Sequence, residues 1–274
     1  MKVDVDGIGF NVLLHDSEYD NHKAPIIFLH GFTGNAADWQ FIFHQLPKNY
    51  YPVAIDLIGH GGTDSPEDPK HYSCSSIVYQ IYTIAQKLGF EKFLITGYSM
   101  GGRAALSFTL RHPSKIKALI LESATAGIED ICDQKQRVQL DLLLADKIKE
   151  QGVESFTEFW FNTPLFQSLK NLTDFEAEKN KRNRNSVVGL TNMLSGFSTG
   201  LMPNYWERIH TIEMPVLLIS GELDEKYTSI NRTMKSLIPN SLHHIVPETG
   251  HNTHLENPVL FAKFVADFLN SIEG

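Results

Sequence analysis

The hydrophobic pattern of the chain alternates between short, continuously apolar runs and longer stretches in which apolar residues recur at helical spacing. Helical patterns cover residues 77–88, which end before Gly89, and residues 100–111, which end before Pro113. Continuous apolar runs are typical of strands buried on both faces of a parallel sheet. In the first half of the chain they cover residues 25–30, 51–56, 92–97 and 117–121. Because strands and helices alternate, the pattern predicts an α/β fold with a doubly wound, mostly parallel sheet.

The two ends of the sequence carry further elements of this fold. Asp6 and Gly7 are turn residues between short alternating segments, which predicts a β-hairpin at the start. Apolar runs return at residues 214–221 and 242–246, and Pro258 opens a final amphipathic helix. We therefore expect the sheet to be built from both halves of the sequence.

The middle of the chain lacks strand signals. From about Thr125 to about Trp206 the sequence is rich in Gln, Lys, Asn and Leu and shows helical periodicity. We therefore predict an inserted helical lid at residues 125–206 and an α/β core formed by residues 1–124 and 207–274.

The composition is that of an ordinary globular protein. The 274 residues are 42% hydrophobic and 20% charged, and the formal net charge of -8 argues against nucleic acid or an anionic membrane as a partner. No stretch approaches the roughly 20 apolar residues that cross a bilayer, so we expect no membrane insertion. Cys74 and Cys132 match no zinc or redox spacing and are expected to be free thiols. These features favour a cytoplasmic location.

The strongest chemical signal is the pattern G-x-S-x-G at residues 97–101, around Ser99. It stands between a buried strand and a helix, which is the context of the nucleophile elbow in the α/β-hydrolase fold. The same pattern occurs around Ser198, but no strand precedes it and no helix follows it. We therefore predict that Ser99 is the catalytic serine and that the match at Ser198 is accidental.

A serine nucleophile or base needs a histidine to take its proton and an acid to orient that histidine. Asp224 follows the apolar run 214–221, and His251 follows the last predicted strand, so the chain order is the one this fold uses. Glu122 and Glu222 are alternative acids. His251 and His254 have the spacing H-x-x-H, but no third ligand stands at a recognisable distance, so no metal site is predicted.

A glycine-rich turn follows the first parallel strand at residues 30–34, with the sequence HGFTG. Such a turn donates a backbone N–H to an oxyanion, and we predict Phe32 N–H and Met100 N–H as the donor pair. The loop at residues 56–64 contains Asp56 and His60, for which we expect a structural role in supporting this turn.

Cations accompany these residues. Arg103 lies one turn into the helix that follows Ser99, where a guanidinium would recognise a carboxylate bidentately. The alternative is an ordinary helix arginine that reaches solvent. The predicted lid carries further candidates for such a pocket, which are Arg137, Arg182, Arg184 and the aromatic Trp160. Together they suggest a small anionic substrate.

Three segments resemble signature segments of the 2-succinyl-6-hydroxy-2,4-cyclohexadiene-1-carboxylate synthases, which are α/β-hydrolase-fold enzymes of menaquinone biosynthesis. The segments are HGFTG at residues 30–34, GYSMGGR at 97–103 and GELDEK at 221–226. The resemblance runs across essentially the whole chain. It implies that Tyr98 and Arg103 flank the substrate beside Ser99.

The resemblance also implies roles for lid residues. Arg137 is similar to the arginine of the first lid helix, Trp160 to a lid aromatic residue, and Arg184 to an arginine of a later lid helix, with Arg182 as the alternative. Lys226 matches a basic residue near the acid. The chain departs from the family at residues 123–127, where a Pro-Gly pair is more usual, and at residues 135–137, where the family has an Arg-Arg pair.

The activity that the resemblance implies is a lyase reaction. Pyruvate is eliminated from 2-succinyl-5-enolpyruvyl-6-hydroxy-3-cyclohexene-1-carboxylate, and Ser99 acts as the base with help from His251 and Asp224. The oxyanion turn would hold charge that develops on a substrate carboxylate. No cofactor is implied, the partner is a small polycarboxylate, and a monomer or weak homodimer is expected.

Two other functions remain open at this stage. A carboxylesterase or C–C bond hydrolase of the same fold would act through an acyl-enzyme, and a binding protein could keep the fold without catalysis. A binding protein is expected to lose one of the three catalytic residues. A hydrolase is expected to have an apolar lid and no arginine beside the elbow, so Arg103 favours the lyase.

Overall fold

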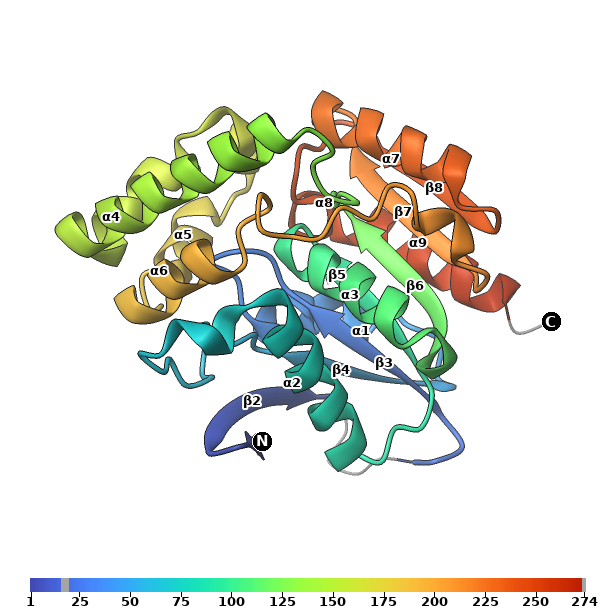
Figure 1. Cartoon of the computed structure of the whole chain (residues 1–274). Helices are drawn as coiled ribbons and strands as arrows, with labels where there is room; N and C mark the ends of the chain where they lie inside the picture. The colour runs from blue at the N-terminus through green and yellow to red at the C-terminus, as the bar shows by residue number, and fades with distance from the viewer. Residues whose placement is uncertain (16–19, 273–274) are drawn as a thin grey trace.

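One sheet organises the part of the chain that the computed structural model describes, residues 1–15 and 20–272 (Figure 1). Its strand order is β1-β2-β4-β3-β5-β6-β7-β8. The strands are β1 (Lys2–Val5), β2 (Ile8–Leu14), β3 (Ala24–Leu29), β4 (Tyr50–Ile55), β5 (Phe93–Tyr98), β6 (Ile116–Glu122), β7 (Val216–Gly221) and β8 (Ser241–Val246). The pairs β1/β2 and β2/β4 are antiparallel and the others are parallel. The predicted mostly parallel sheet is confirmed.

The burial of the strands follows their position in the sheet. Every residue of β4, β5 and β7 is buried, as expected for strands that are covered on both faces. In β1 buried and exposed residues alternate, as in an edge hairpin. Asp6 and Gly7 join β1 to β2 with φ values of 53° and 83°, the left-handed pair that a tight hairpin turn requires.

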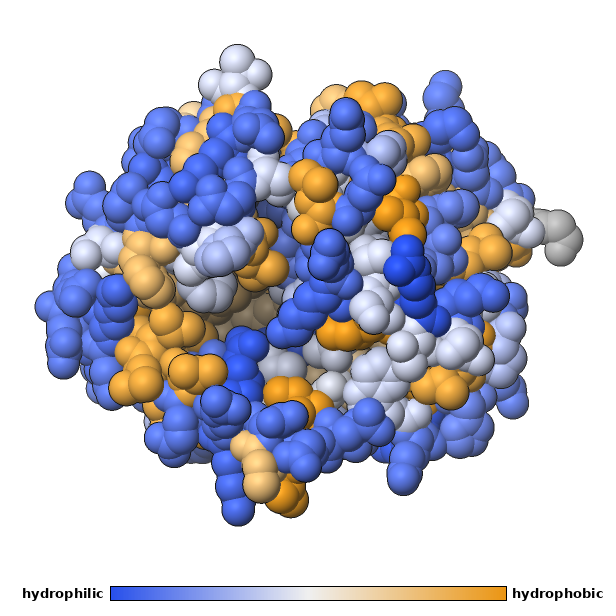
Figure 2. Space-filling model, turned by 90° about the horizontal axis from the view of Figure 1, so that it is seen from above, coloured by the Kyte–Doolittle hydropathy of each residue, from blue (hydrophilic) through white to orange (hydrophobic). Residues whose placement is uncertain are grey.

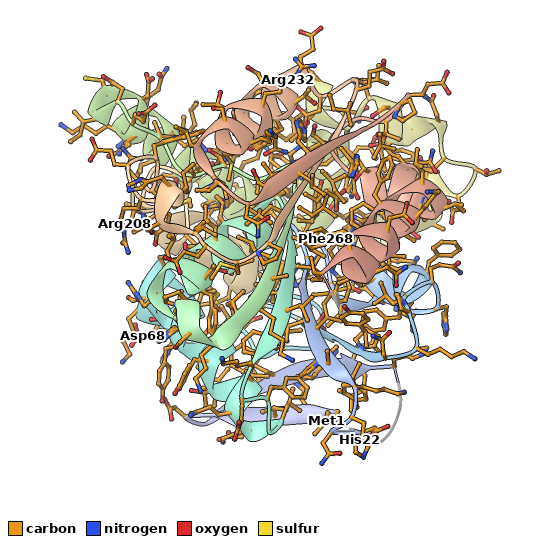
Figure 3. All side chains as sticks on the ribbon, turned by 90° about the vertical axis from the view of Figure 1, so that its right-hand side faces the viewer. Met1, His22, Asp68, Arg208, Arg232 and Phe268 are labelled. Carbon is orange, nitrogen blue, oxygen red and sulfur yellow. The ribbon has the colours of Figure 1, made fainter. Side chains whose placement is uncertain are left out.

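Helices cover both faces of the sheet. The helices α2 (Cys74–Lys87), α3 (Met100–Arg111) and α7 (Glu225–Leu237) pack against one face, and α1 (Gln40–Phe43) and α9 (Pro258–Ser271) against the other. Figure 3 shows the twisted strands between these layers, with Phe268 of α9 buried against them. The shorter helices are η1 (Ala36–Trp39), η2 (Pro69–Tyr72), η3 (Pro113–Lys115), η6 (Ile209–Thr211) and α8 (Thr253–Glu256).

A group of helices connects β6 to β7 and stands to the left of the sheet in Figure 1. We call it the α4–α6 segment; it comprises α4 (Ile131–Phe161), η4 (Pro164–Phe166), η5 (Ser168–Asn171), α5 (Phe175–Arg182) and α6 (Val187–Gly196). Gly152, with φ 79° and ψ 170°, interrupts α4. Apolar residues of α4 and α6, such as Phe156 and Leu190, form their own small core. These helices fall where the sequence predicts a lid.

None of the helices in the described ranges, 1–15 and 20–272, has the length and apolar character needed to span a bilayer.

Candidate active site

The predicted site residues gather at one edge of the sheet because each follows the carboxyl end of a parallel strand. Ser99 follows β5, Asp224 follows β7, and His251 comes after β8. Phe32 follows β3. Carboxyl ends of neighbouring parallel strands meet at the same edge, which is where ligands bind in α/β sheets.

The turn that carries Ser99 is strained and tightly packed. Ser99 has φ 49° and ψ -106°, a conformation that a residue with a side chain rarely adopts. A Cβ atom at Gly101 would overlap the carbonyl oxygens of Leu29 and His30, so only glycine lets this turn approach β3. The elbow predicted from the G-x-S-x-G pattern is therefore present in its geometry.

Ser99, His251 and Asp224 form a chain of hydrogen bonds. Ser99 Oγ lies 2.9 Å from His251 Nε2, and His251 Nδ1 lies 2.6 Å from Asp224 Oδ2. Asp224 Oδ1 accepts a hydrogen bond from Tyr227 N–H at the start of α7. His251 and Asp224 are buried. This arrangement can move a proton from Ser99 to His251 while Asp224 fixes the tautomer of the imidazole.

The turn at residues 30–34 is held by its own groups. Gly31 C=O accepts hydrogen bonds from Gly34 N–H (3.0 Å) and from His30 Nδ1–H (2.7 Å). Because His30 Nε2 accepts from Leu57 N–H at 2.9 Å, the His30 proton is on Nδ1. Burial lowers the pKa of His30, which favours this neutral form. In a trans peptide the N–H points away from the preceding C=O, so Phe32 N–H faces away from these contacts.

A cleft lies above these residues, and Figure 2 shows it from above as a hollow in the molecular surface. Its cavity volume is about 150 Å³. Phe32, Ser99, Met100 and His251 line its floor. The other lining residues come largely from the α4–α6 segment and its neighbours, and they include Arg103, Arg137, Asp141, Trp160, Phe197, Ser198, Lys226 and Tyr227.

Arg103 is the buried cation of this cleft. Its Nη1 donates to Phe197 O at 2.8 Å, and its guanidinium carbon lies 4.5 Å from the centre of the Phe197 ring. Burial and the charge of Arg137 lower the pKa of Arg103 to about 10, so it stays protonated at neutral pH. Within residues 1–15 and 20–272, no carboxylate forms an ion pair with it. A buried cation without an anionic partner is a binding group for an anion.

Arg137 and Trp160 also face the cleft. Arg137 Nε lies 3.0 Å from both carboxylate oxygens of Asp141, and Ser198 Oγ donates to Asp141 Oδ2 at 2.6 Å. The buried Nε1–H of Trp160 has no hydrogen-bond acceptor in the described part of the chain. Since buried N–H groups are normally paired, this donor is available to a ligand.

Comparison with known proteins assigns the family. A family model described as alpha/beta hydrolase fold matches residues 24–258. A Bacillus subtilis (strain 168) protein, named as a 2-succinyl-6-hydroxy-2,4-cyclohexadiene-1-carboxylate synthase, is 40% identical over 97% of this chain and 97% of its own length. The chain belongs to this synthase family. The synthase of Enterobacter sp. (strain 638) is 29% identical, with 89% of this chain and 91% of that protein covered. The solved structure of MenH from S. aureus is 31% identical, covers 96% of this chain and 99% of its own, and superposes with a TM-score of 0.90.

Membership of the synthase family confirms the predicted fold and the resemblance, whereas the structure places three of the proposed substrate residues outside the lining of the cleft. Tyr98 does not line the cleft: it is buried beneath the triad, where its ring packs against His251 and His254 at centroid distances of 5.3 and 5.0 Å. Tyr98 is the last residue of β5, and its side chain points into the layer below the elbow.

Arg182, the last residue of α5, and Arg184, which follows this helix, are not among the residues that line the cleft. Arg184 is exposed and lines a separate cavity with Asn35 and Gly61. Arg182 is buried, and its Nη1 lies 2.8 Å from both oxygens of Asp38. Although burial alone would lower the pKa of Arg182, the charge of Asp38 raises it. Neither Arg182 nor Arg184 lines the cleft in the described structure, so the choice between them as a substrate residue stays a prediction.

The alternative acids have other partners. Glu122 accepts hydrogen bonds from Thr253 Oγ1, His254 N–H and His254 Nδ1, so it holds the loop after His251. Glu222 accepts from Glu248 N–H. As expected for a supporting loop, Asp56 Oδ1 accepts from Ala36 N–H at 2.5 Å.

Several residues that line the cleft were not predicted from the sequence, among them Asp141, Ser198 and Tyr227. The spacing of Arg137 and Asp141, four residues apart on one helix, was the available signal. Ser198 donates its hydroxyl to Asp141, no histidine among the described residues hydrogen-bonds to it, and it lines the cleft. Tyr227 follows Asp224 by three residues, and its ring centre lies 4.5 Å from that of His251.

Proposed function

We propose that this synthase-family enzyme eliminates pyruvate from 2-succinyl-5-enolpyruvyl-6-hydroxy-3-cyclohexene-1-carboxylate to give 2-succinyl-6-hydroxy-2,4-cyclohexadiene-1-carboxylate, a step of menaquinone biosynthesis. The observation that carries the proposal is the buried Arg103, which forms no ion pair with a carboxylate of the described residues and lines the same cleft as the hydrogen-bonded Ser99 and His251. An anion-binding group next to a serine base suits a substrate with three carboxylates.

Comparing the substrate with the product shows which bonds break and form in the reaction. The proton at C2 is lost, the ring double bond moves to form the 2,4-diene, and the bond from C5 to the enolpyruvyl oxygen breaks. The C2 proton is acidic because C2 carries the succinyl carbonyl. Negative charge therefore develops on that carbonyl oxygen rather than on a carboxylate. The proposed donors that stabilise it are the N–H groups of Phe32 and Met100, two residues that line the cleft.

Ser99 is the base in this proposal. Its Oγ takes the C2 proton while its own proton passes to His251 Nε2, and Asp224 stabilises the imidazolium that forms. The leaving enolpyruvate then receives a proton and becomes pyruvate, which restores the starting protonation of Ser99 and His251. All steps are proton transfers and bond shifts, so no cofactor takes part.

Four side chains are proposed to hold the carboxylates. Arg103 lies nearest the elbow, Arg137 and Trp160 come from α4, and exposed Lys226 stands at the rim. Arginine and tryptophan N–H donors match carboxylate oxygens geometrically. The enzyme is proposed to act as a monomer or weak homodimer in the cytoplasm, which is consistent with the two free cysteines.

Hydrolysis of a carboxylic ester is the second candidate, because the same triad can form an acyl-enzyme. The two functions are separated by presenting purified enzyme with the cyclohexene tricarboxylate and, in parallel, with short-chain aryl esters. We expect release of pyruvate and slow ester turnover. Brisk ester hydrolysis without pyruvate release would establish the hydrolase instead.

A further inference from the structure

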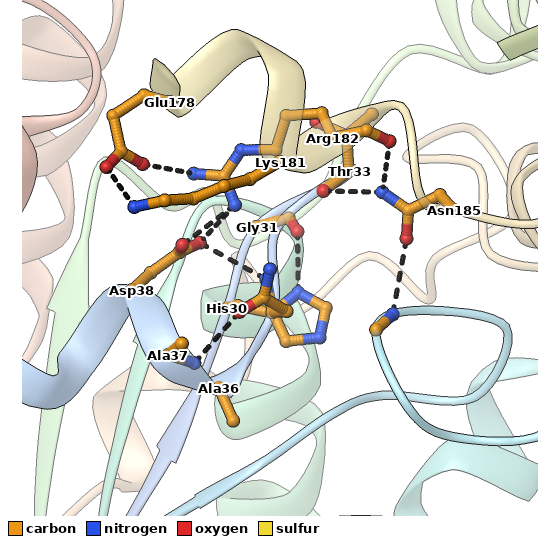
Figure 4. A network of polar contacts seen from close by, with 12 residues as sticks. His30, Gly31, Thr33, Ala36, Ala37, Asp38, Glu178, Lys181, Arg182 and Asn185 are labelled. Atoms are coloured by element: carbon orange, nitrogen blue, oxygen red, sulfur yellow. Dashed lines mark hydrogen bonds and ion pairs between the residues drawn. The ribbon is translucent and has the colours of Figure 1, made fainter. Parts of the chain in front are cut away.

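One side chain of the α4–α6 segment reaches two loops at the edge of the sheet (Figure 4). Asn185 Nδ2 donates to Thr33 O at 2.8 Å, and Asn185 Oδ1 accepts from Gly61 N–H at 3.2 Å. Asn185 Nδ2 also donates to Arg182 O at 2.9 Å, which fixes the amide relative to the end of α5. Asn185 therefore joins the α4–α6 segment to the turn that carries Phe32 N–H.

A buried ion pair reinforces this junction a few residues away. Arg182 and Asp38 have side chains that are only 4% and 6% exposed, and Glu178 lies within 3.8 Å of Arg182. Asp38 Oδ2 in turn accepts from Asn35 N–H and closes the capping box of η1. The segment from Thr33 to Asp38 is thus held at both ends by residues 182 and 185.

The turn needs this support because its backbone is strained. The hydrogen bond from Gly34 N–H to Gly31 O closes a β-turn with Phe32 and Thr33 at its centre, and Thr33 has φ 67°. Glycine or asparagine normally takes such a position, and for a β-branched residue a positive φ is an outlier. Strained residues persist where the surrounding structure holds them in place.

We propose that Asn185 is a positioning residue that keeps Thr33 in this conformation and thereby aims Phe32 N–H at the developing oxyanion. The inference rests on the proposed function for the identity of that oxyanion. Under this proposal, the α4–α6 segment supports the turn that carries an oxyanion donor, so it contributes to catalysis as well as to substrate binding.

The test uses Asn185→Asp, which keeps an acceptor for Gly61 N–H but no longer donates to Thr33 O. We expect kcat for pyruvate release to fall about 10-fold, a part of the roughly 100-fold loss that removal of an entire oxyanion donor causes, with KM changed less than about twofold. Asn180→Ala, at an exposed asparagine in α5, should leave both constants unchanged.

Two further measurements distinguish a loss of oxyanion-donor positioning from a general loss of structure. Inactivation of Ser99 by a fluorophosphonate forms an oxyanion at the same donors, and it should slow in Asn185→Asp by a similar factor. In the background of Thr33→Gly, where a positive φ costs little, Asn185→Asp should lose less than about threefold. Asn185→Ala serves as a second variant, and thermal unfolding reports whether each variant folds.

The inference is overturned if Asn185→Asp folds and keeps wild-type kcat and inactivation rate, or if only KM changes. Fluorophosphonate inactivation does not depend on the natural substrate. If the wild-type enzyme releases no pyruvate but inactivation still depends on Asn185, the proposed reaction fails while the positioning role stands.

Discussion

Asp141 holds Arg137 by one edge of its guanidinium, since Arg137 Nε lies 3.0 Å from both oxygens of the carboxylate one helical turn away. In the described part of the chain no residue accepts a hydrogen bond from the two Nη groups of Arg137, which leaves them for a ligand in the cleft. The role of orienting Arg137 explains why the buried carboxylate of Asp141 lies in a cleft that we propose binds an anionic substrate.

The first prediction concerns Asp141→Asn. Loss of the charged contact frees Arg137, whose side chain is 34% exposed, to turn toward solvent. Hydrogen bonds to charged groups contribute about 1.5–3 kcal/mol, so we expect KM to rise about 10-fold while kcat changes little. Steady-state kinetics of pyruvate release measure both constants. A lower KM would show that Asp141 acts mainly by repelling the substrate.

A second prediction concerns Arg103. Replacement by methionine removes the buried guanidinium from beside Ser99, and we expect kcat/KM to fall by the equivalent of about 1.5–3 kcal/mol. Arg103→Lys should recover only part of this loss, because an ammonium cannot bind a carboxylate bidentately. Arg111→Ala, at the exposed end of the same helix, is the matched control. Unchanged kcat/KM in Arg103→Met would exclude the proposed carboxylate contact.

The buried pair of Arg182 and Asp38 gives a prediction for stability. Asp38→Asn leaves a buried guanidinium without its main counter-charge, which should lower the free energy of unfolding by about 3–5 kcal/mol. Lys149→Ala breaks the exposed pair with Asp146 and should change it by less than about 1 kcal/mol. Urea denaturation measures both. Equal effects of the two substitutions would contradict the account.

Stability should also fall in acid because of His60. Burial lowers the pKa of His60 from 6.5 to about 3. Below pH 6.5, His60 therefore becomes protonated in the unfolded chain while it stays neutral in the folded protein. The stabilising contribution is complete above pH 6.5 and is lost between pH 6.5 and about 3, with a slope of up to about 1.4 kcal/mol per pH unit. Comparing the pH dependence of unfolding in the wild type and in His60→Gln tests this. Between about pH 3 and 6.5, the free energy of unfolding of the variant should change with pH less steeply than that of the wild type, by the contribution of about one proton. Equal slopes for the two proteins would refute the assignment.

The parts of the site that follow from chain order could be predicted from the sequence. Ser99, Asp224 and His251 each follow a strand of a parallel sheet, so the topology alone brings them to one edge. Arg103 could be predicted because its helix starts at the elbow.

The outer wall of the cleft could not be predicted in the same way. Whether Arg182, Arg184 or Arg137 faces the cleft depends on how α4, α5 and α6 pack on the core. The buried pair of Arg182 with Asp38 is a tertiary contact that helical periodicity does not encode, whereas Arg137 and Asp141 pair within one helix. The direction of the Tyr98 side chain could not be predicted from the motif either, since this side chain packs in the core layer on the side of α9.

The central claim is that Ser99 is the base that starts pyruvate elimination. The direct measurement is single-turnover pyruvate release from the cyclohexene tricarboxylate by the wild type and by Ser99→Ala, with bound substrate measured separately. The account predicts substrate binding within about threefold of wild type and a rate of pyruvate release at least about 1,000-fold lower. Pyruvate release by Ser99→Ala at the wild-type rate would contradict it.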